Sequence, residues 1–502
     1  MPKAPPALLI TFVLSTILAF LMPQIARGED VVGLPGILEP LLGALRSDRL
    51  FREGEVGIAV VDLETGELVF GEAPTRPLVP ASTMKVLTAA AALRYLGPAW
   101  RFTTEVYVDG EIDAEGTLNG NLYIKGTGDP TMVVERLWKL VMDIRLSGIE
   151  RIAGRVVLDE TYMKPEYRLP GWGKERDIRV GPSYFPTLSA LTLNHNAVGI
   201  IVGPGTAVGE SARVQLETEA PDYVTVVNEV TTGSSRSRRW LDIEREVVDG
   251  RMRYTVTGSV PAGAEAGWYY RTVEDPTSHF AAALAHLTKS QGLSVARGFR
   301  RGTVPQSADL LFVRRSAPLG ALLMEMNKNS LNLHAELVLR ALGAEVEGGS
   351  GTTAKGLTVV ARYLSELGVP EEQYTLVNGS GLSRTAGLSP ASITAVLADM
   401  AGRSETYGEF YASLAIAGRD GTLWRRLTDA PGRLRGKTGT IDGVHCLVGY
   451  VDGVGGRRYA FAFLVNGFTG GSSRVKRLHD RFARQMFTVS GDDAAVVAED
   501  GE

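Results

Sequence analysis

The sequence is poor in cysteine and has no excess of positive charge. Its 502 residues include one cysteine, Cys446, which excludes an internal disulfide framework and any metal site built from several cysteines. The formal net charge is −4, from 53 Lys and Arg against 57 Asp and Glu, so we expect no nucleic-acid partner. The sequence also lacks H-E-x-x-H and any equivalent ligand spacing, and it therefore predicts neither a metal nor a cofactor.

An apolar run long enough to span a bilayer comfortably is missing at the N-terminus. Ala7–Met22 has 16 residues, against about 20 for a transmembrane helix. It follows Lys3 and precedes the small residues Ala26 and Gly28, which is the order of a secretory signal peptide. We predict a signal peptide at 1–28 and an exported protein of the periplasm or cell wall, with an uncleaved anchor as the alternative.

Length and composition indicate a soluble globular protein of about three domains. Hydrophobic residues make up 44% and charged residues 22%, and the 58 glycines predict many turns and much β structure. Helical patterns lie on both sides of a long stretch of short β-like runs. We predict an α/β (α+β) fold in which a parent domain is interrupted by a mainly β insertion. The predicted ranges are 29–101 and 312–490 for the parent domain, 102–311 for the insertion, about 190–265 for a subdomain nested in it, and 491–502 for an acidic disordered tail.

The first element that indicates chemistry is Ser82-Thr83-Met84-Lys85, at the start of a predicted buried helix. Positions i and i+3 share a helix face, so the Lys85 amine can lie against the Ser82 hydroxyl. A lysine whose pKa is lowered by burial can remove the hydroxyl proton and make the serine a nucleophile. Taken alone, the pattern fits equally a helix N-cap serine followed by a lysine.

The second element is Ser330-Leu331-Asn332, which stands 248 residues after Ser82 at the head of another predicted helix. In an acyl-transfer site Ser330 would relay a proton from the base to the leaving amine. The Asn332 amide would hold a backbone carbonyl of the substrate. As ordinary structure, this element is also a helix N-cap.

The third element, Lys437-Thr438-Gly439-Thr440, begins a predicted strand that runs to Tyr450. A strand can bind an extended peptide by edge pairing, and Gly439 would give the peptide close access. The Lys437 amine and the hydroxyls of Thr438 and Thr440 would face a terminal carboxylate. A surface turn is the ordinary alternative for this element.

In this order, the three elements are the S-x-x-K, S-x-N and K-T-G signature of penicillin-binding proteins and serine β-lactamases. The chain resembles the class C low-molecular-mass penicillin-binding proteins, the D-Ala-D-Ala carboxypeptidase/endopeptidase family. Lys125–Met132 (KGTGDPTM) is similar to the G-x-GDPT segment of that family. Asn378–Arg384 (NGSGLSR) is similar to its D-G-S-G-L-S-R segment, with Asn378 in place of Asp. Pro170–Trp172 and 189–196 are similar to the inserted region of the family.

The resemblance implies a transpeptidase-like domain with a large insertion and an exported serine D,D-peptidase that cleaves peptidoglycan stem peptides. Ser82 would attack the carbonyl of the penultimate D-alanine, with Lys85 as base and the backbone N–H groups of Ser82 and Thr440 as oxyanion hole. Penicillins would acylate Ser82 as inhibitors. Asp177, in the inserted region, would hold the amino group of the stem-peptide diamino acid; a solvated loop carboxylate is the alternative.

Three other functions remain as alternatives at this stage. A β-lactamase-like hydrolase shares the acylation residues, and a catalytically silent cell-wall-binding protein shares the scaffold. A Cys–His dyad at His445 and Cys446 is disfavoured, because adjacent strand residues point to opposite faces. An amphipathic helix at 472–487 would pack on a sheet or lie on a membrane, so membrane association is compatible with the sequence but not required by it.

Overall fold

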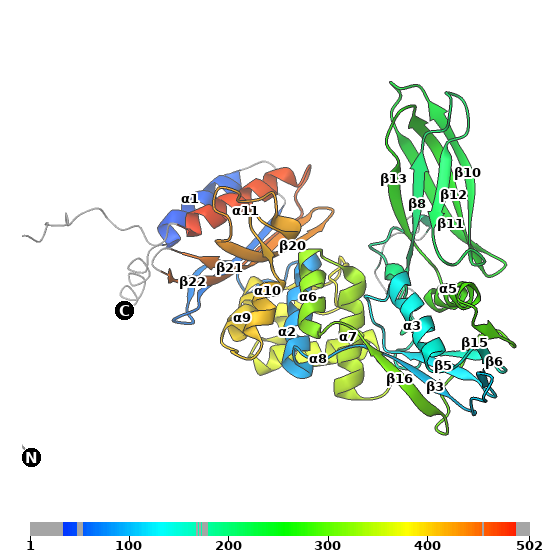
Figure 1. Ribbon diagram of the computed structural model, residues 1–502. Helices are drawn as coiled ribbons and strands as arrows, with labels where there is room; N and C mark the ends of the chain where they lie inside the picture. The colour runs from blue at the N-terminus through cyan, green and yellow to red at the C-terminus, as the bar shows by residue number, and fades with distance from the viewer. Residues whose placement is uncertain are drawn as a thin grey trace, which may run out of the picture.

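The computed structural model describes residues 34–47, 54–166, 169, 172, 179–453 and 456–487 (Figure 1). The predicted signal peptide, Asp177 and the predicted acidic tail lie outside these residues, so those three predictions stay predictions. Within the described part of the chain, no helix is both long enough and apolar enough to cross a membrane.

A six-stranded antiparallel sheet joins segments from the two ends of the described chain. Its strand order is β19-β20-β21-β22-β1-β2, so the N-terminal β1 pairs with β22 from near the C-terminus. The strands are β1 (Glu55–Asp62), β2 (Leu68–Glu72), β19 (Ala415–Ile416), β20 (Leu434–Ile441), β21 (Val444–Asp452) and β22 (Arg458–Asn466).

The prediction of one continuous strand from Lys437 to Tyr450 is wrong. Asp442 and Gly443 form a turn that separates β20 from β21, and Gly443 has a φ of +70°. Asp-Gly is a favoured pair for tight hairpin turns, because glycine adopts positive φ without strain. The motif strand β20 therefore has its own antiparallel partner, with Lys437 opposite Val448.

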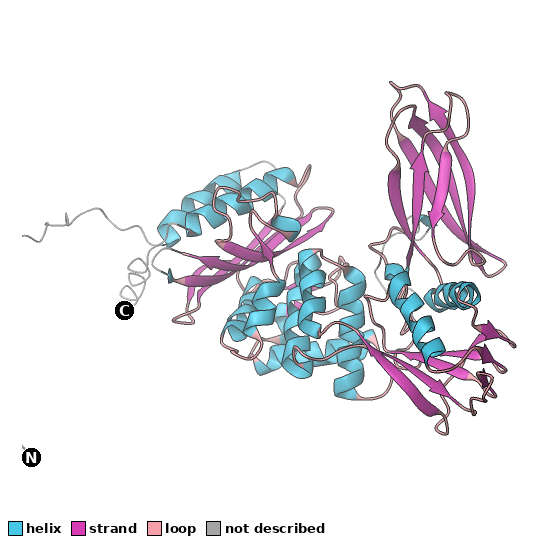
Figure 2. Cartoon of the chain, viewed as in Figure 1, coloured by secondary structure: helices cyan, strands magenta, loops and turns pink. Residues whose placement is uncertain are grey.

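One face of this sheet is covered by α1 (Leu34–Ser47) and α11 (Ser473–Met486) (Figures 1 and 2). In α11, Val475, Phe482 and Met486 are buried against the sheet. The basic face of this helix points outward and pairs in part with acids, as in the ion pair between Arg484 and Asp429. The apolar face of α11 therefore packs on the sheet. This is one of the two possibilities that the sequence left open for this helix, the other being a position on a membrane.

The other face of the sheet is covered by a helical layer with α2 (Met84–Leu96) at its centre (Figure 1). Every residue of α2 from position 84 to 93 is buried, which confirms the predicted buried helix. The run Ala89–Ala92 has small side chains that permit close helix packing. The surrounding helices are α6 (Leu319–Lys328), α7 (Asn332–Glu347), α8 (Thr353–Glu366), α9 (Pro390–Ala401) and α10 (Tyr407–Ser413). The short elements of this part are the 3₁₀ turns η2 (Ala81–Thr83), η4 (Glu371–Gln373) and η5 (Gly421–Leu423), and the strand pair β17 (Tyr374–Thr375) and β18 (Gly387–Leu388).

Between α2 and α6 the chain builds a five-stranded sheet in the order β15-β7-β5-β3-β16, packed with α3 (Val134–Leu146) and α5 (Pro276–Ser290). Its strands are β3 (Thr103–Val108), β5 (Leu122–Gly126), β7 (Val156–Asp159), β15 (Phe299–Arg301) and β16 (Asp309–Arg315). A small sheet of β4 (Thr117–Leu118), β6 (Arg151–Ile152) and β14 (Ser294–Val295) flanks it. The predicted end of the insertion at 311 falls inside β16, which pairs with β3 as far as Arg315.

Two three-stranded sheets project from this part of the molecule (Figure 2). One has the order β13-β8-β9, with β8 (Ala197–Gly203) following the turn η3 (Asn194–Asn196), and with β9 (Arg213–Glu217) and β13 (Gly267–Thr272). The other has the order β10-β12-β11, from β10 (Val224–Gly233), β11 (Trp240–Val248) and β12 (Arg251–Pro261). Their inner faces share one core with α3 and α5, separate from the core around α2.

Candidate active site

The three sequence motifs meet where the helical layer adjoins the edge of β20. Ser82 lies in η2, Lys85 in the first turn of α2, Ser330 and Asn332 at the start of α7, and Lys437 on β20. The Lys85 Nζ lies 3.0 Å from the Ser82 Oγ, and the Lys437 Nζ donates to the Ser330 Oγ at 2.9 Å. The fold thus brings together side chains separated by up to 355 positions along the chain.

The partners of Lys85 suit a neutral amine. Its Nζ also donates to Asn332 Oδ1 at 2.7 Å and to the Ser380 carbonyl oxygen at 2.8 Å, two atoms that can only accept. A neutral amine has two hydrogens and one lone pair. When both hydrogens go to these acceptors, the lone pair is left for the third partner, the Ser82 hydroxyl.

Burial shifts the pKa of both lysines downward. Burial first, and the charge of Lys437 second, lower the pKa of Lys85 well below its ordinary value, while Glu336 acts in the opposite direction. Burial also lowers the pKa of Lys437 to about 7. Lys85 is therefore placed where it can be neutral and basic at physiological pH.

Glu336 is a site residue that the sequence reasoning missed. It lies on α7 one turn after Asn332 and is fully buried. Its carboxylate accepts hydrogen bonds from the backbone N–H groups of Ser380 at 2.8 Å and Gly379 at 3.1 Å. Thr88 of α2 donates to the Gly379 carbonyl at 2.8 Å. These bonds fix the backbone segment whose Ser380 carbonyl meets Lys85. The sequence did contain one indication of this role, because Glu336 follows Asn332 by four residues and so lies on the same face of the helix.

The segment that begins with Asn378 forms a tight turn beside the nucleophile. Asn378 Oδ1 accepts from the Gly381 N–H at 2.8 Å, and its Nδ2 donates to the Leu382 carbonyl at 3.3 Å. An added Cβ at Gly381, which has a φ of +77°, would collide with the Ala81 carbonyl oxygen. An asparagine thus holds this turn with a neutral side chain where the family pattern has an aspartate.

Gly439 lets β20 approach the turn that carries Ser82. A Cβ at position 439 would lie 2.6 Å from the Pro80 carbonyl oxygen and 3.2 Å from the Ser82 backbone nitrogen. The residue before Gly439 is Thr438, and its hydroxyl donates a hydrogen bond to the Thr422 hydroxyl at 2.8 Å. A side chain larger than hydrogen at 439 would therefore push the strand away from the nucleophile.

Two residues of the site adopt a backbone conformation that is unusual for a non-glycine residue. Ala81, just before the nucleophile, has a φ of +46°, and Ser330 has a φ of +59°. Such left-handed residues cost about 1–3 kcal/mol each and persist where the surrounding structure holds them. At this site the strain therefore lies at Ser330 itself and at the residue just before Ser82. Ser330 is also not the N-cap of α7, because that position belongs to Leu331.

The remaining candidate groups are structural. His445 contacts His479, with 3.2 Å between the two Nδ1 atoms, and burial lowers the pKa of His445 to about 3. Burial raises the pKa of the Cys446 thiol, whose Sγ lies 3.6 Å from the Val79 carbonyl oxygen. The Cys–His dyad disfavoured from the sequence is thus absent from this site. Asp129 caps a turn by accepting from the Thr131 N–H at 2.9 Å. No group of three or more metal-ligating side chains occurs within the part of the chain described above.

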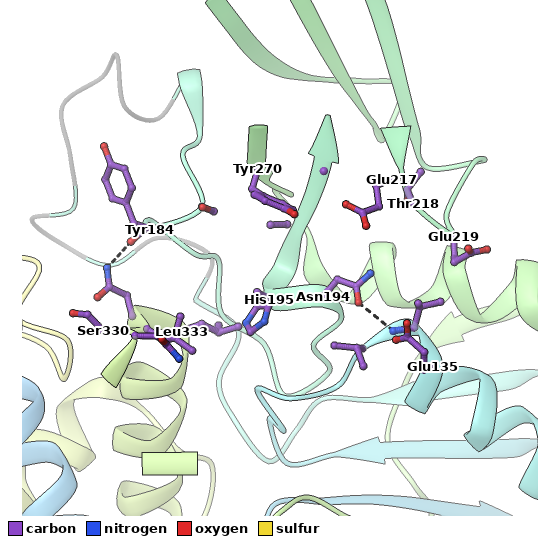
Figure 3. A pocket seen from close by; sticks show the side chains of 18 residues that line it. Glu135, Tyr184, Asn194, His195, Glu217, Thr218, Glu219, Tyr270, Ser330 and Leu333 are labelled. Carbon is purple, nitrogen blue, oxygen red and sulfur yellow. Dashed lines mark hydrogen bonds between the residues drawn. The ribbon is translucent and has the colours of Figure 1, made fainter. Parts of the chain in front are cut away.

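A cavity of about 560 Å³ opens from the Ser330 side of the site into the inserted region (Figure 3). Ser330 and Tyr184 lie at one end of it, and Asn332 also lines it. There the Asn332 Nδ2 donates to the Tyr184 carbonyl oxygen at 2.7 Å, which orients the amide so that its oxygen faces Lys85. The inserted region thus supplies part of the wall of the catalytic site.

Residues 43–485 match the D-Ala-D-Ala carboxypeptidase 3 (S13) family. The chain belongs to this family. It is 36% identical over 435 residues to the D-alanyl-D-alanine carboxypeptidase of Actinomadura sp. (strain R39), covering 83% of this chain and 79% of that protein. It is 26% identical over 437 residues to the D-alanyl-D-alanine carboxypeptidase DacB of Haemophilus influenzae, covering 86% of this chain and 90% of that protein. The family resemblance stated from the motifs is confirmed.

The fold of this S13 protein matches a solved relative over most of its length. The crystal structure of penicillin-binding protein 4 from H. influenzae superposes with a TM-score of 0.78 at 24% sequence identity, covering 90% of this chain and 99% of that chain. A complex of that protein with a β-lactam has the same fold, with a TM-score of 0.75. The predicted penicillin-binding-protein-like fold is therefore confirmed.

Proposed function

We propose that this S13 protein is an exported serine D-Ala-D-Ala carboxypeptidase and endopeptidase that acts on peptidoglycan stem peptides through an acyl-Ser82 intermediate. The observation that carries the proposal is the Ser82–Lys85 pair, in which a buried amine has two acceptors for its hydrogens and one hydroxyl left for its lone pair. This is the arrangement that a serine nucleophile needs in order to be activated without histidine.

In the acylation step, Lys85 takes the proton from Ser82, and the serine oxygen attacks the carbonyl carbon of the penultimate D-alanine. The negative charge that develops on the carbonyl oxygen would be stabilised by the backbone N–H groups of Ser82 and Thr440. The close approach of Gly439 to the Ser82 nitrogen supports this placement. One oxyanion-hole donor is typically worth about 3 kcal/mol of transition-state stabilisation.

Collapse of the tetrahedral intermediate breaks the C–N bond, and the departing amine takes a proton from the Ser330 hydroxyl. The 2.9 Å hydrogen bond from Lys437 supports Ser330 as a relay, because it holds the Ser330 hydroxyl in place. The proton that Lys85 took from Ser82 replaces the one that Ser330 gives up, so Lys85 is neutral again before deacylation. Asn332 would hold a carbonyl of the acyl part. Water then cleaves the ester, which restores the Ser82 hydroxyl. Free D-alanine leaves in the carboxypeptidase reaction, and the side-chain amine of a neighbouring strand leaves in the endopeptidase reaction.

Recognition of the substrate ends would come from two places. Lys437, Thr438 and Thr440 on β20 would bind the terminal carboxylate, which favours peptides that end next to the scissile bond. Asp177 stays a proposal for the amino group of the diamino acid. The expected result for Asp177→Ala is a raised muropeptide KM with an unchanged rate of penicillin acylation, whereas an unchanged KM would remove Asp177 from the site.

Purified muropeptides test the function directly. On incubation with the enzyme, monomeric pentapeptides are expected to lose D-alanine and cross-linked dimers to be split into monomers, both followed by chromatography and mass spectrometry. Absence of both products would contradict the peptidase and favour a silent cell-wall binder. Complete turnover of penicillin, with no lasting acyl-enzyme, would favour a β-lactamase-like hydrolase.

The pH dependence of acylation tests the assignment of the base. The rate should rise with pH as Lys85 loses its proton, because only the neutral amine accepts one. Lys437→Met removes a charge that lowers the Lys85 pKa, so the rising limb should move to higher pH. Glu336→Gln removes a charge that raises this pKa, so the limb should move to lower pH. Shifts in the same direction, measured with a fluorescent penicillin, would contradict the assignment.

A further inference from the structure

The outer face of the β13-β8-β9 sheet carries exposed aromatic side chains. Trp268 is 55% exposed and Tyr270 is 49% exposed, whereas Tyr269 between them packs toward the core. Residues i and i+2 of a strand point to the same side and lie about 7 Å apart. Two rings therefore stand in a row on β13, and neighbouring exposed apolar groups of this kind can mark a binding site, whereas single ones do not.

Strand register places polar side chains opposite these rings. Trp268 pairs with Ile201 of β8, which pairs with Gln215 of β9. Tyr270 pairs in the same way with Gly199, which pairs with Glu217.

Gly199 of β8 has no side chain, so the surface between Tyr270 on β13 and Glu217 on β9 is open. A Cβ there would lie 3.3 Å from a Tyr270 ring carbon and would collide with the Glu217 carboxylate. This face of the sheet therefore has aromatic side chains on β13, a glycine on the central strand β8, and polar side chains on β9. We call Trp268, Tyr270, Ile201, Gln215 and Glu217 the aromatic face.

The aromatic face is continuous with the catalytic cavity. Tyr270 and Glu217 line the same cavity as Ser330 and Asn332. Figure 3 shows Ser330, Tyr270 and Glu217 along its length. Among the described residues, those that line this cavity include three glutamates and no lysine or arginine. A ligand that extends from the catalytic serine along this cavity therefore meets aromatic rings and hydrogen-bond acceptors rather than an anion-binding surface.

We propose that the aromatic face binds the glycan strand from which the substrate's stem peptide hangs. The inference rests on the proposed function for its choice of polymer. The C–H faces of sugar rings stack on flat aromatic side chains such as Trp268 and Tyr270. Their hydroxyl and acetamido groups suit the carboxylate of Glu217 and the amide of Gln215. The sugar acid that bears the peptide has its carboxyl group in the amide bond, so the strand is neutral there and needs no cation.

The test compares a pentapeptide with the same pentapeptide linked to its disaccharide. The wild-type enzyme is expected to cleave the sugar-linked substrate with a kcat/KM about tenfold higher, and Trp268→Ala should lose most of that preference while keeping its rate on the free peptide. Trp240→Ala is the matched control. Trp240 is 60% exposed on β11, and since Leu241 and Ile243 face the core, it lies on the outer face of the other sheet. Its preference should equal that of the wild type.

Peptide-free glycan strands separate this inference from the proposed function. Calorimetry should show binding to the wild type and to Trp240→Ala, and at least about fivefold weaker binding to Trp268→Ala. If neither peptide is cleaved but the strands still bind through Trp268, the peptidase proposal fails and the aromatic face stands. Equal cleavage of both substrates by the wild type, with no binding of strands, overturns the aromatic face alone. A preference that is kept in full in Trp268→Ala would also overturn it, because the exposed rings would then contribute nothing to the recognition of the sugars.

Discussion

Replacing Ser82 with alanine is expected to abolish covalent labelling by penicillin. The wild-type protein should carry a penicilloyl adduct on the proteolytic peptide that contains Ser82, because the strained lactam carbonyl takes the place of the peptide carbonyl. The variant lacks the attacking oxygen, so its peptidase rate should fall by at least about 10⁴-fold. Mass spectrometry of the intact protein and of its peptides gives both results.

The control for Ser82→Ala is Ser330→Ala. Ser330 would act only in proton transfer, so this variant should still form an adduct at Ser82, at a rate reduced by about 10²–10⁴-fold. The two serines therefore give qualitatively different results, one without any adduct and one with a slow adduct. An adduct that survives in Ser82→Ala, or one that maps to Ser330, would contradict the nucleophile assignment.

The central elements of the site could be predicted because their signals are local in sequence. The alanine-rich segment after Lys85 favours a buried helix, and α2 has this form. Ser82 lies in a 3₁₀ turn just before α2 and not within the helix. The i, i+3 spacing still brings its hydroxyl to the Lys85 amine. The placement of Asn332 at the start of α7 and of Lys437 on a strand also followed from short-range patterns.

The groups that support Lys85 could not be predicted in this way. Its bond to the Ser380 carbonyl joins positions 295 residues apart, and the bonds of Glu336 to the 379–380 backbone span more than 40. A glutamate on a helix is typical of a solvated face, and its burial here depends on how α7 packs against α2. The aromatic face was equally hidden, because it depends on the register between β13, β8 and β9.

The break between β20 and β21 is a different case, because its signal was present. Asp442-Gly443 is a strong hairpin signal, but apolar residues on both sides made 436–450 read as one run. The run is apolar because β21 is buried on both faces. Cys446 and Val448 face the α2 layer, and Leu447 faces the layer of α1 and α11. A strand buried on both faces loses the alternation that normally marks its ends.

The site concentrates features that oppose stability. Burial lowers the pKa of Lys437 from 10.5 to about 7. Below about pH 7 the buried amine is charged in the folded state, and the full desolvation cost lowers the free energy of unfolding. Above the unfolded-state pKa the amine is neutral in both states, and this cost is absent. The pKa of Lys85 is also lowered, so its burial opposes folding in the same way. Ala81 and Ser330 add backbone strain at the same place. The large cores around α2 and beneath α11 hold these residues in the conformations that the chemistry needs.

Replacing Lys85 with methionine is expected to slow penicillin acylation by about 10³-fold or more. Methionine has nearly the length of lysine and suits a fully buried position, so the variant should fold. It leaves the Asn332 Oδ1 and the Ser380 carbonyl without their lysine hydrogen bonds, a cost of about 1–3 kcal/mol each. That cost is offset because an ionisable amine is no longer buried. The rate is measured with a fluorescent penicillin and the fold by thermal melting.

Lys85→Arg distinguishes a base from a mere positive charge. A guanidinium keeps the charge and can donate to the same acceptors, but it does not lose its proton at any pH at which the protein folds. If Lys85 is the base, Arg and Met variants should be similarly slow, and neither should show the rise in rate with pH expected of the wild type. If the positive charge alone were needed to polarise Ser82, the Arg variant would retain most of the rate. That second outcome would contradict the base role of Lys85 and leave the nucleophile without an activating group.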